Sequence, residues 1–463
     1  MSLNVKPTTD AAPTTGRRLL PLVALGTALV LVTYVTPMAT IPATAADLGA
    51  GPVARAWILS SMSAGLATAL LATGVLGDTF GRRRVYVAGL GALGLGALLC
   101  GLAQEPLLYV AARVLQGMGG AAVLACGLAL LAHSFAPGPE RVHATSVWGA
   151  SVGLGIASGA VLAAALDIGS GWRETYVAVA VIAFALLVPT LRALPGSSRT
   201  HARAIDVPGL VLLVAGMTLL VSALTQGRNG IDTPTVVLAA LAVVALVAFG
   251  LVEARVRMPL LDPELLANRR FRGATMGSLV LGAGIIGMSA FVPTVAQVGL
   301  GASLWTACWL VVLWAGTSVV SSLLVRHLPH PLEGPFPIAV LLVGVAIGQA
   351  CGYGIATDSS PWRLAVSMVV SGVATGFLNA VLGRESVASV PPDRAAMGSG
   401  ANNTARYLGA ALGITLFVTV ATHAGDGLVD GWNVAVLVST VLTLAGAAAI
   451  AATGLGGRSE RAH

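Results

Sequence analysis

The segment GVLGDTFGRRR, residues 74–84, is a short polar break between two long apolar runs at residues 57–77 and 85–103. Each run has about the 20 residues that an α-helix needs to cross the hydrocarbon core of a bilayer. The segment has an acidic residue, Asp78, and three consecutive arginines, which belong at a membrane surface and not within the hydrocarbon. The sequence here therefore predicts two transmembrane helices joined by a short loop at one face of the membrane.

The composition of the whole chain is that of a membrane protein. Charged side chains make up 10% of the 463 residues and hydrophobic ones 56%, and the mean hydropathy is +0.87. A soluble chain carries roughly 25% charge, so this composition excludes a soluble enzyme, a disordered tail and a secreted disulfide scaffold. The four cysteines have no metal-ligand spacing, and the net charge of +7 is dispersed. No metal, cofactor or nucleic acid is therefore expected.

Apolar runs of spanning length recur along the entire chain. The first follows Arg17 and Arg18 and lacks a small-residue cleavage site, so we interpret it as a span and not as a removed signal peptide. The expected fold is an all-α membrane protein with 14 transmembrane helices. The predicted spans are residues 19–42, 57–77, 85–103, 107–132, 144–166, 175–194, 207–225, 234–252, 273–295, 303–325, 336–356, 363–383, 400–422 and 432–454.

The distribution of basic residues predicts the orientation. With the N-terminus inside, the inner segments hold all of the 26 lysines and arginines except Arg113 and Arg406, which lie within spans, and Arg55, Arg173, Arg228 and Arg363. This excess on one side places both termini in the cytoplasm. Lys6 is the only lysine, a codon bias typical of GC-rich bacteria, so the expected location is the bacterial cytoplasmic membrane. An aromatic belt at the outer surface is predicted from Trp57, Trp172, Trp362 and Trp432.

An internal repeat divides the chain into two related halves. A shift of 253 residues carries run 19–42 onto 272–295, Gly81 onto Gly334, and Pro139-Glu140-Arg141 onto Pro392-Asp393-Arg394. Halves of this kind are common in transporters, with the substrate site between them near the bilayer midplane. The predicted domains are a cytoplasmic tail (1–18), a six-helix bundle (19–194), a linker with two extra helices (195–271), a second six-helix bundle (272–454) and a cytoplasmic tail (455–463).

The segment 74–84 resembles the signature of the major facilitator superfamily, glycine-x-leucine-x-aspartate-x-x-glycine followed by basic residues. The resemblance implies a conformational switch in which a carboxylate accepts backbone N–H groups and pairs with arginine. RVLQGMGGA at 113–121 and GSGANNTARYLG at 398–409 are similar to patterns of the fourteen-span drug/proton antiporter subfamily, and the likeness to bacterial, actinomycete-like members covers essentially the whole chain. The implied switch residues are Gly74, Asp78, Gly81, Arg82 and Arg83.

Two positions depart from the pattern of that subfamily. The aspartate that is usual in the first span corresponds to Thr33 here. The glycine-proline signature of the fifth span is reduced to Gly155 and Gly159, which still permit close helix packing. The resemblance implies efflux driven by the proton gradient, but the first-span carboxylate and the fifth-span proline are absent.

Embedded polar residues narrow the class of substrate. All 19 carboxylates are predicted in loops or at helix ends. A buried cation needs a nearby carboxylate, so a neutral, zwitterionic or anionic substrate is favoured over a cationic one. The candidate residues of the substrate or coupling cavity are Thr33, Arg113, Gln116, Asn402, Asn403 and Arg406.

Each of these cavity residues has a structural alternative. Either arginine can extend toward the headgroups, and Arg406 can also act as a structural latch. Asn402 can form a helix contact, and Thr33 can bond to its own helix backbone.

The predicted function is export of a small apolar drug-like or antibiotic compound by alternating access, linked to the proton gradient. The expected partners are that substrate, protons and the bilayer, and the protein is expected to be a monomer. An enzyme is not expected, because the sequence offers no buried acid/base pair, no nucleophile with an adjacent base and no metal cluster. The alternatives are an importer or uniporter of a small neutral or anionic metabolite, and a membrane sensor that does not transport.

Overall fold

The computed structural model describes residues 13–166, 172–193, 206–227, 232–256, 265, 267–328 and 332–455. This part of the chain contains helices and no strands. The helices of the first half and the linker are α1 (Pro13–Asp47), α2 (Pro52–Phe80), α3 (Arg82–Leu102), α4 (Pro106–Ser134), α5 (Pro139–Ala165), α6 (Arg173–Ala193), α7 (Val207–Gly227) and α8 (Thr233–Glu253).

The second half begins with α10 (Arg269–Leu281), which continues through a π-helical turn η1 (Gly282–Ile286), α11 (Gly287–Thr294) and a second π-helical turn η2 (Val295–Gly299). The remaining elements are α12 (Leu304–Leu324), η3 (Val325–His327), α13 (Pro335–Ala350), α14 (Arg363–Ala388), η4 (Pro392–Arg394), α15 (Ala395–His423) and α16 (Leu428–Leu455).

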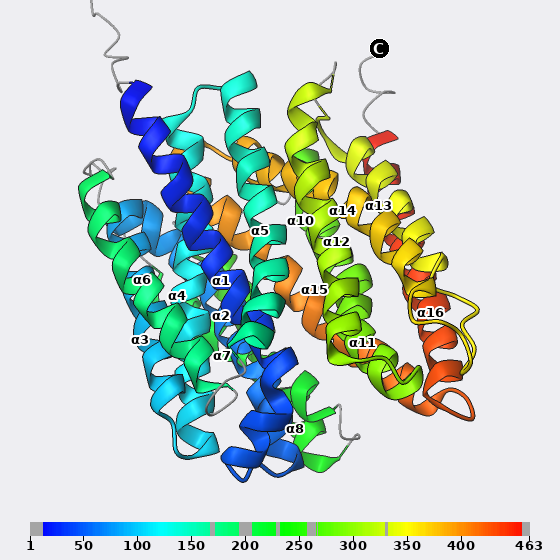
Figure 1. Ribbon diagram of the computed structural model, residues 1–463. Coiled ribbons are helices and arrows are strands. Elements are labelled where there is room, and N and C mark those ends of the chain that lie inside the picture. The colour runs from blue at the N-terminus through cyan, green and yellow to red at the C-terminus, as the bar shows by residue number, and fades with distance from the viewer. Residues whose placement is uncertain are drawn as a thin grey trace, which may run out of the picture.

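The prediction of fourteen apolar helices is confirmed. Within the residues that the structure describes, thirteen helical segments are long and apolar enough to cross a membrane, and Arg269–Gly299 counts as one of them. The fourteenth is α13, which has 16 residues and is shorter than expected. The start of α1 and the end of α16 lie at the same end of the molecule (Figure 1), as an even number of spans requires. The outer parts of the two predicted tails, residues 1–12 and 456–463, lie outside the described residues.

The helices form two bundles, each with its own apolar core. One core joins α1 to α6 and includes Tyr86 and Trp148, and the other joins α10 to α16 and includes Met288 and Trp432. The bundles meet where α5 packs against α12 and α14 and where α2 packs against α15. The inserted helix α7 packs against both α2 and α15, and α8 packs against α7. The inserted pair therefore lies along the seam between the bundles.

Local sequence explains where several helices begin. Proline stands in the first turn of α2, α4, α5 and α13, where its missing N–H costs no helix hydrogen bond and its fixed φ suits the helix. The helix α10 begins after Asn268, whose side chain accepts hydrogen bonds from the N–H groups of Arg270 and Phe271. These caps fix the loops that connect the spans.

Glycines allow the closest helix approaches. A Cβ at Gly155 of α5 would lie 2.4 Å from the carbonyl oxygen of Ala28 in α1, and one at Gly159 would lie 2.9 Å from the carbonyl oxygen of Val32. A Cβ at Gly282 of η1 would lie 2.1 Å from the carbonyl oxygen of Arg406 in α15. Backbone therefore packs directly on backbone at these crossings, as small residues permit in membrane proteins.

Gly155→Val is expected to lower the free energy of unfolding by about 1–3 kcal/mol, because the added side chain must push α5 away from the backbone of α1. Thermal unfolding in detergent measures this loss. Gly91→Val is the matched control, since nothing lies within 4 Å of a Cβ at that position of α3. Equal stability of the two variants would contradict the close packing of α1 and α5.

Candidate functional site

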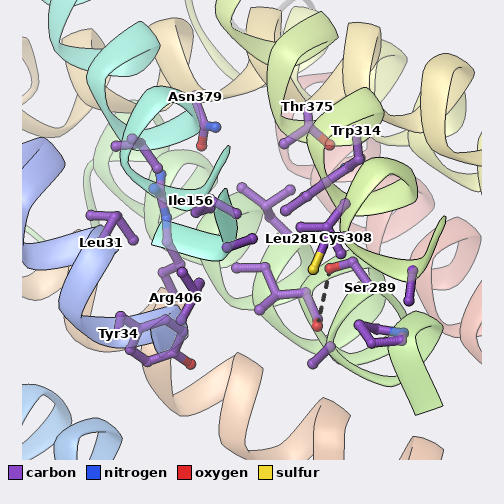
Figure 2. A pocket seen from close by; sticks show the side chains of 18 of the residues that line it. Leu31, Tyr34, Ile156, Leu281, Ser289, Cys308, Trp314, Thr375, Asn379 and Arg406 are labelled. Carbon is purple, nitrogen blue, oxygen red and sulfur yellow. Dashed lines mark hydrogen bonds between the residues drawn. The ribbon is translucent and has the colours of Figure 1, made fainter. Parts of the chain in front are cut away.

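A pocket with a volume of about 100 Å³ lies between the two bundles. Its lining residues come from α1 and α5 of the first bundle and from α10 to α12, α14 and α15 of the second. Figure 2 shows Leu31, Tyr34 and Arg406 together on one side of this space, with Cys308 and Trp314 on the other. The lining is mainly apolar, and Arg406 is its only charged residue among those that the structure describes. The pocket therefore suits an apolar compound that also offers an acceptor or a negative charge.

Arg406 lies in the interior of the molecule. Its helix α15 begins at Ala395, five residues earlier than the predicted span, so Arg406 lies deeper than the sequence suggested. The residue is 3% exposed, and its Nε and Nη2 atoms have no hydrogen-bond partner in the described part of the chain. The neighbouring Tyr407 packs edge-on against Tyr34 of α1, with ring centroids 5.6 Å apart. A buried guanidinium with free donors is a strong attractor for an anion.

Arg113 forms a second polar site, inside the first bundle. Its Nη1 donates to the carbonyl oxygen of Thr33 at 2.7 Å and to Oε1 of Gln116 at 3.1 Å. The Thr33 carbonyl needs this donor because the residue four positions later is Pro37, which has no N–H. Arg113 is fully buried, so its side chain does not extend to the membrane surface. Its Nε and Nη2 atoms, and Nε2 of Gln116, have no hydrogen-bond partner among the described residues.

The other predicted cavity residues form hydrogen bonds at helix contacts, although Nδ2 of Asn402 is buried without a hydrogen-bond partner among the described residues. The hydroxyl of Thr33 donates to the carbonyl of Leu29 in its own helix at 2.7 Å. Asn402 accepts a hydrogen bond from Ser278 of α10 at 2.7 Å, and Asn403 donates to the carbonyl of Ser399 at 3.0 Å. Of the six predicted cavity residues, the structure brings only Arg406 to the pocket lining. For Thr33 and Asn402, these bonds correspond to the structural alternatives.

The predicted switch residues do come together, at what we call the Asp78 end of the molecule. The Asp78 carboxylate accepts hydrogen bonds from the backbone N–H of Met397 at 2.8 Å and of Ala396 at 3.3 Å, and from Nε of Arg82 at 2.9 Å. These N–H groups belong to the first turn of α15, where they lack helix partners and carry the positive end of the helix dipole. Asp78 therefore joins the last turn of α2 to the second bundle.

The rest of the switch supports this contact. Arg82 donates from Nη2 to the carbonyl of Pro392 at 2.6 Å, and Arg83 donates to the carbonyl of Leu191 in α6. Gly81 has a φ of +104°, which glycine adopts without strain, and it lets α3 begin directly after α2. A Cβ at Gly74 would lie 2.5 Å from the carbonyl oxygen of Ala396, so only glycine permits this approach of α2 to α15.

Three buried carboxylates among the described residues were not singled out from the sequence, Asp206, Glu253 and Glu385, and Glu385 is the most deeply buried. The predicted twelfth span ends at residue 383, but α14 continues to Ala388 and completely buries the side chain of Glu385. Glu385 accepts hydrogen bonds from Nε of Arg270 at 2.9 Å and from Nη2 of Arg270 at 3.0 Å. The only signal in the sequence was an acidic residue beside Arg384 at the end of an apolar run. The partner of Glu385, Arg270 on α10, is 115 residues away, and no sequence pattern marks it.

Comparison with known proteins gives a consistent result. The family model described as Major Facilitator Superfamily matches residues 23–414. The puromycin resistance protein pur8 of Streptomyces alboniger is 33% identical, over 86% of this chain and 83% of that protein. The cephamycin export protein CmcT of Amycolatopsis lactamdurans is 32% identical, over 91% of each. The fold is similar to that of the human organic anion transporter MFSD10, with a TM-score of 0.67, 18% identity, and coverage of 92% of this chain and 99% of that one.

Proposed function

The chain belongs to the major facilitator superfamily, and we propose that it exports a small apolar, drug-like or antibiotic compound across the bacterial cytoplasmic membrane. The observation that carries this proposal is the apolar pocket between the two bundles, which are tied together at one end by Asp78. The names of the two bacterial relatives, for puromycin resistance and cephamycin export, support efflux of such compounds.

The positions of the contacts between the bundles support alternating access. If the excess of basic residues faces inward, the Asp78 end is cytoplasmic and both termini are inside. Ser322 of α12 also donates to the carbonyl of Ser146 in α5 at 3.0 Å, in the half of α5 nearer that end. The present conformation then has its cytoplasmic side closed, and uptake of substrate from the cytoplasm requires these contacts to break. A ligand that binds one arrangement better shifts the equilibrium toward it.

The charge preference that we propose is for neutral or anionic compounds. Arg406 is the only charge on the described pocket lining, and no carboxylate there offsets the desolvation of a cation. The proposed partners are therefore a neutral or anionic substrate, protons and the bilayer, with the protein acting as a monomer.

Flux into liposomes tests the proposed function. The purified protein is reconstituted with its cytoplasmic face outward, and uptake of cationic, neutral and anionic drug-like compounds is measured with and without a pH gradient. We expect uptake of neutral or anionic compounds to accelerate when the lumen is acidic, as proton-coupled export requires. Saturable uptake of a quaternary ammonium dye would refute the charge preference. Flux of the compound down its own concentration gradient, at a rate that does not depend on the pH gradient, would favour the alternative of a uniporter.

Arg406→Gln is expected to raise the KM for an anionic compound by about tenfold to a hundredfold, because a hydrogen bond to a charged group contributes about 1.5–3 kcal/mol. The KM for a neutral compound is expected to change much less. Concentration-dependent flux for a matched pair of compounds measures the difference. Arg363→Gln is the control, because it removes the same charge from an exposed position at the start of α14. Equal losses for both compounds would contradict charge selection by Arg406.

A further inference from the structure

A second cavity, with a volume of about 700 Å³, opens on the seam between the bundles at the Asp78 end. The first bundle contributes the α4–α5 loop and the start of α5, with Arg141 and His143. The second bundle contributes the start of α10, η3, and the end of α14, with further basic residues. The ionisable residues that line this cavity are Arg141, His143, Arg270, Arg326, His327, Glu333 and Arg384. We call this space the basic cavity.

Two carboxylates, Glu333 of the lining and the buried Glu385 behind it, contact two of the arginines of the basic cavity. Arg270 pairs with Glu385 and, at 3.4 Å, with Glu333. Arg384 contacts Glu385 at 3.4 Å and donates to the carbonyl of Leu332. Its Nε atom is buried and has no hydrogen-bond partner in the part of the chain that the structure describes. Two carboxylates thus balance two arginines.

The other two arginines have no carboxylate in contact among the described residues. Arg141 donates from Nε and Nη2 to the carbonyl of Phe135, at 3.1 and 3.0 Å. Arg326 donates to Nε2 of His327 at 3.1 Å and contacts Nδ1 of His143 at 3.3 Å. Carbonyl and imidazole groups carry no negative charge, so both positive charges remain unbalanced. The basic cavity therefore has an excess of positive charge that an anion would neutralise.

We propose that the basic cavity binds a phosphate group and that this anion bridges the two bundles. Arginine binds phosphate through paired N–H donors in a fixed geometry, and histidine adds a donor when it is protonated. Arg141 and His143 come from one bundle, while Arg326 and His327 come from the other. An anion held by both sets favours the arrangement in which the Asp78 end is closed. The phosphate group can belong to a soluble ion or to the headgroup of an anionic phospholipid.

Binding measurements on the full-length protein distinguish these sources. In detergent, inorganic phosphate is titrated while thermal unfolding is followed. In a parallel arm, the protein is placed in phosphatidylcholine nanodiscs with and without phosphatidylglycerol. Stabilisation by inorganic phosphate supports a soluble ligand, and stabilisation by phosphatidylglycerol alone supports a lipid headgroup. If neither stabilises the protein, the proposal is overturned.

Variants on each side of the seam test the bridge. Arg326→Gln and Arg141→Gln are each expected to weaken the apparent affinity by about tenfold, the loss of one charge-assisted contact. Arg84→Gln is the control, since it removes an exposed arginine at the start of α3, at the same end of the molecule, that does not line the cavity. Unchanged affinity in both cavity variants would overturn the site. A loss in Arg326→Gln alone would overturn the bridge, because the second bundle would then hold the anion by itself.

Discussion

Asp78→Asn is expected to slow transport by about tenfold to a hundredfold, with little change in the amount of protein in the membrane. The Asp78 carboxylate accepts three hydrogen bonds, from the backbone of Ala396 and Met397 and from Arg82. Asparagine has one acceptor oxygen and turns an NH₂ group toward these donors, so the ionic contact and at least one hydrogen bond are lost. The two backbone hydrogen bonds join α2 to α15, and we expect them to break when the Asp78 end opens in the proposed transport cycle. The variant therefore destabilises one conformation of the cycle more than the fold.

Flux into liposomes at matched protein amounts measures this effect. Glu140→Gln serves as the control, because it removes one negative charge from an exposed position in the first turn of α5. Transport at the wild-type rate in Asp78→Asn would show that the contact between α2 and α15 does not govern the conformational change.

Arg113→Ala is expected to reduce transport by about a hundredfold, since it removes the buried cation of the first bundle together with the donor to Thr33. This result alone would leave two roles unresolved. Arg113 could be needed for its charge, or only to satisfy the carbonyl that Pro37 leaves without a helix partner.

The double variant Arg113→Ala, Pro37→Ala separates these roles. Alanine at position 37 restores a backbone N–H that can donate to the Thr33 carbonyl within α1. We expect the second substitution to restore thermal stability and not transport. Pro37→Ala alone is the matched control for any effect of straightening α1. Recovery of transport in the double variant would show that Arg113 serves the helix backbone and has no separate part in the cycle.

The fold could be predicted from the sequence because the hydropathy and charge of each segment determine by themselves whether that segment spans the membrane. In the described residues each of the fourteen apolar runs is helical, with α13 shorter than a full span, and the segment around Asp78 formed the predicted contact with arginine and backbone N–H groups. These features depend on local composition and on a short motif. The ends of helices were less predictable, because α14 and α15 extend beyond their apolar runs where protein, and not lipid, covers their polar residues.

The cavity could not be predicted in the same way, because it depends on which face of each helix meets another. Asn402 lies one turn from Arg406 on α15, yet it bonds to Ser278 while Arg406 lines the pocket. The prediction of an aromatic belt was wrong for two of its four tryptophans, because the sequence does not show which helix faces meet other protein surfaces. Trp172 and Trp432 are completely buried, and their indole N–H groups bond to Asp47 and to the carbonyl of Gly352. Hydropathy does not distinguish a tryptophan that faces lipid from one that faces protein.

The close approach of Gly282 to the backbone of Arg406 has a consequence for protein engineering. The position of α15 is set there by its main chain, because the carbonyl of residue 406 rests against a glycine and not against an interlocking side chain. The side chain at 406 can therefore be exchanged without repacking the crossing of η1 and α15. If Arg406 selects the substrate as proposed, a small library at this single site is a direct route to transporters with altered substrates, and Gly282 is the residue that such a redesign must leave unchanged.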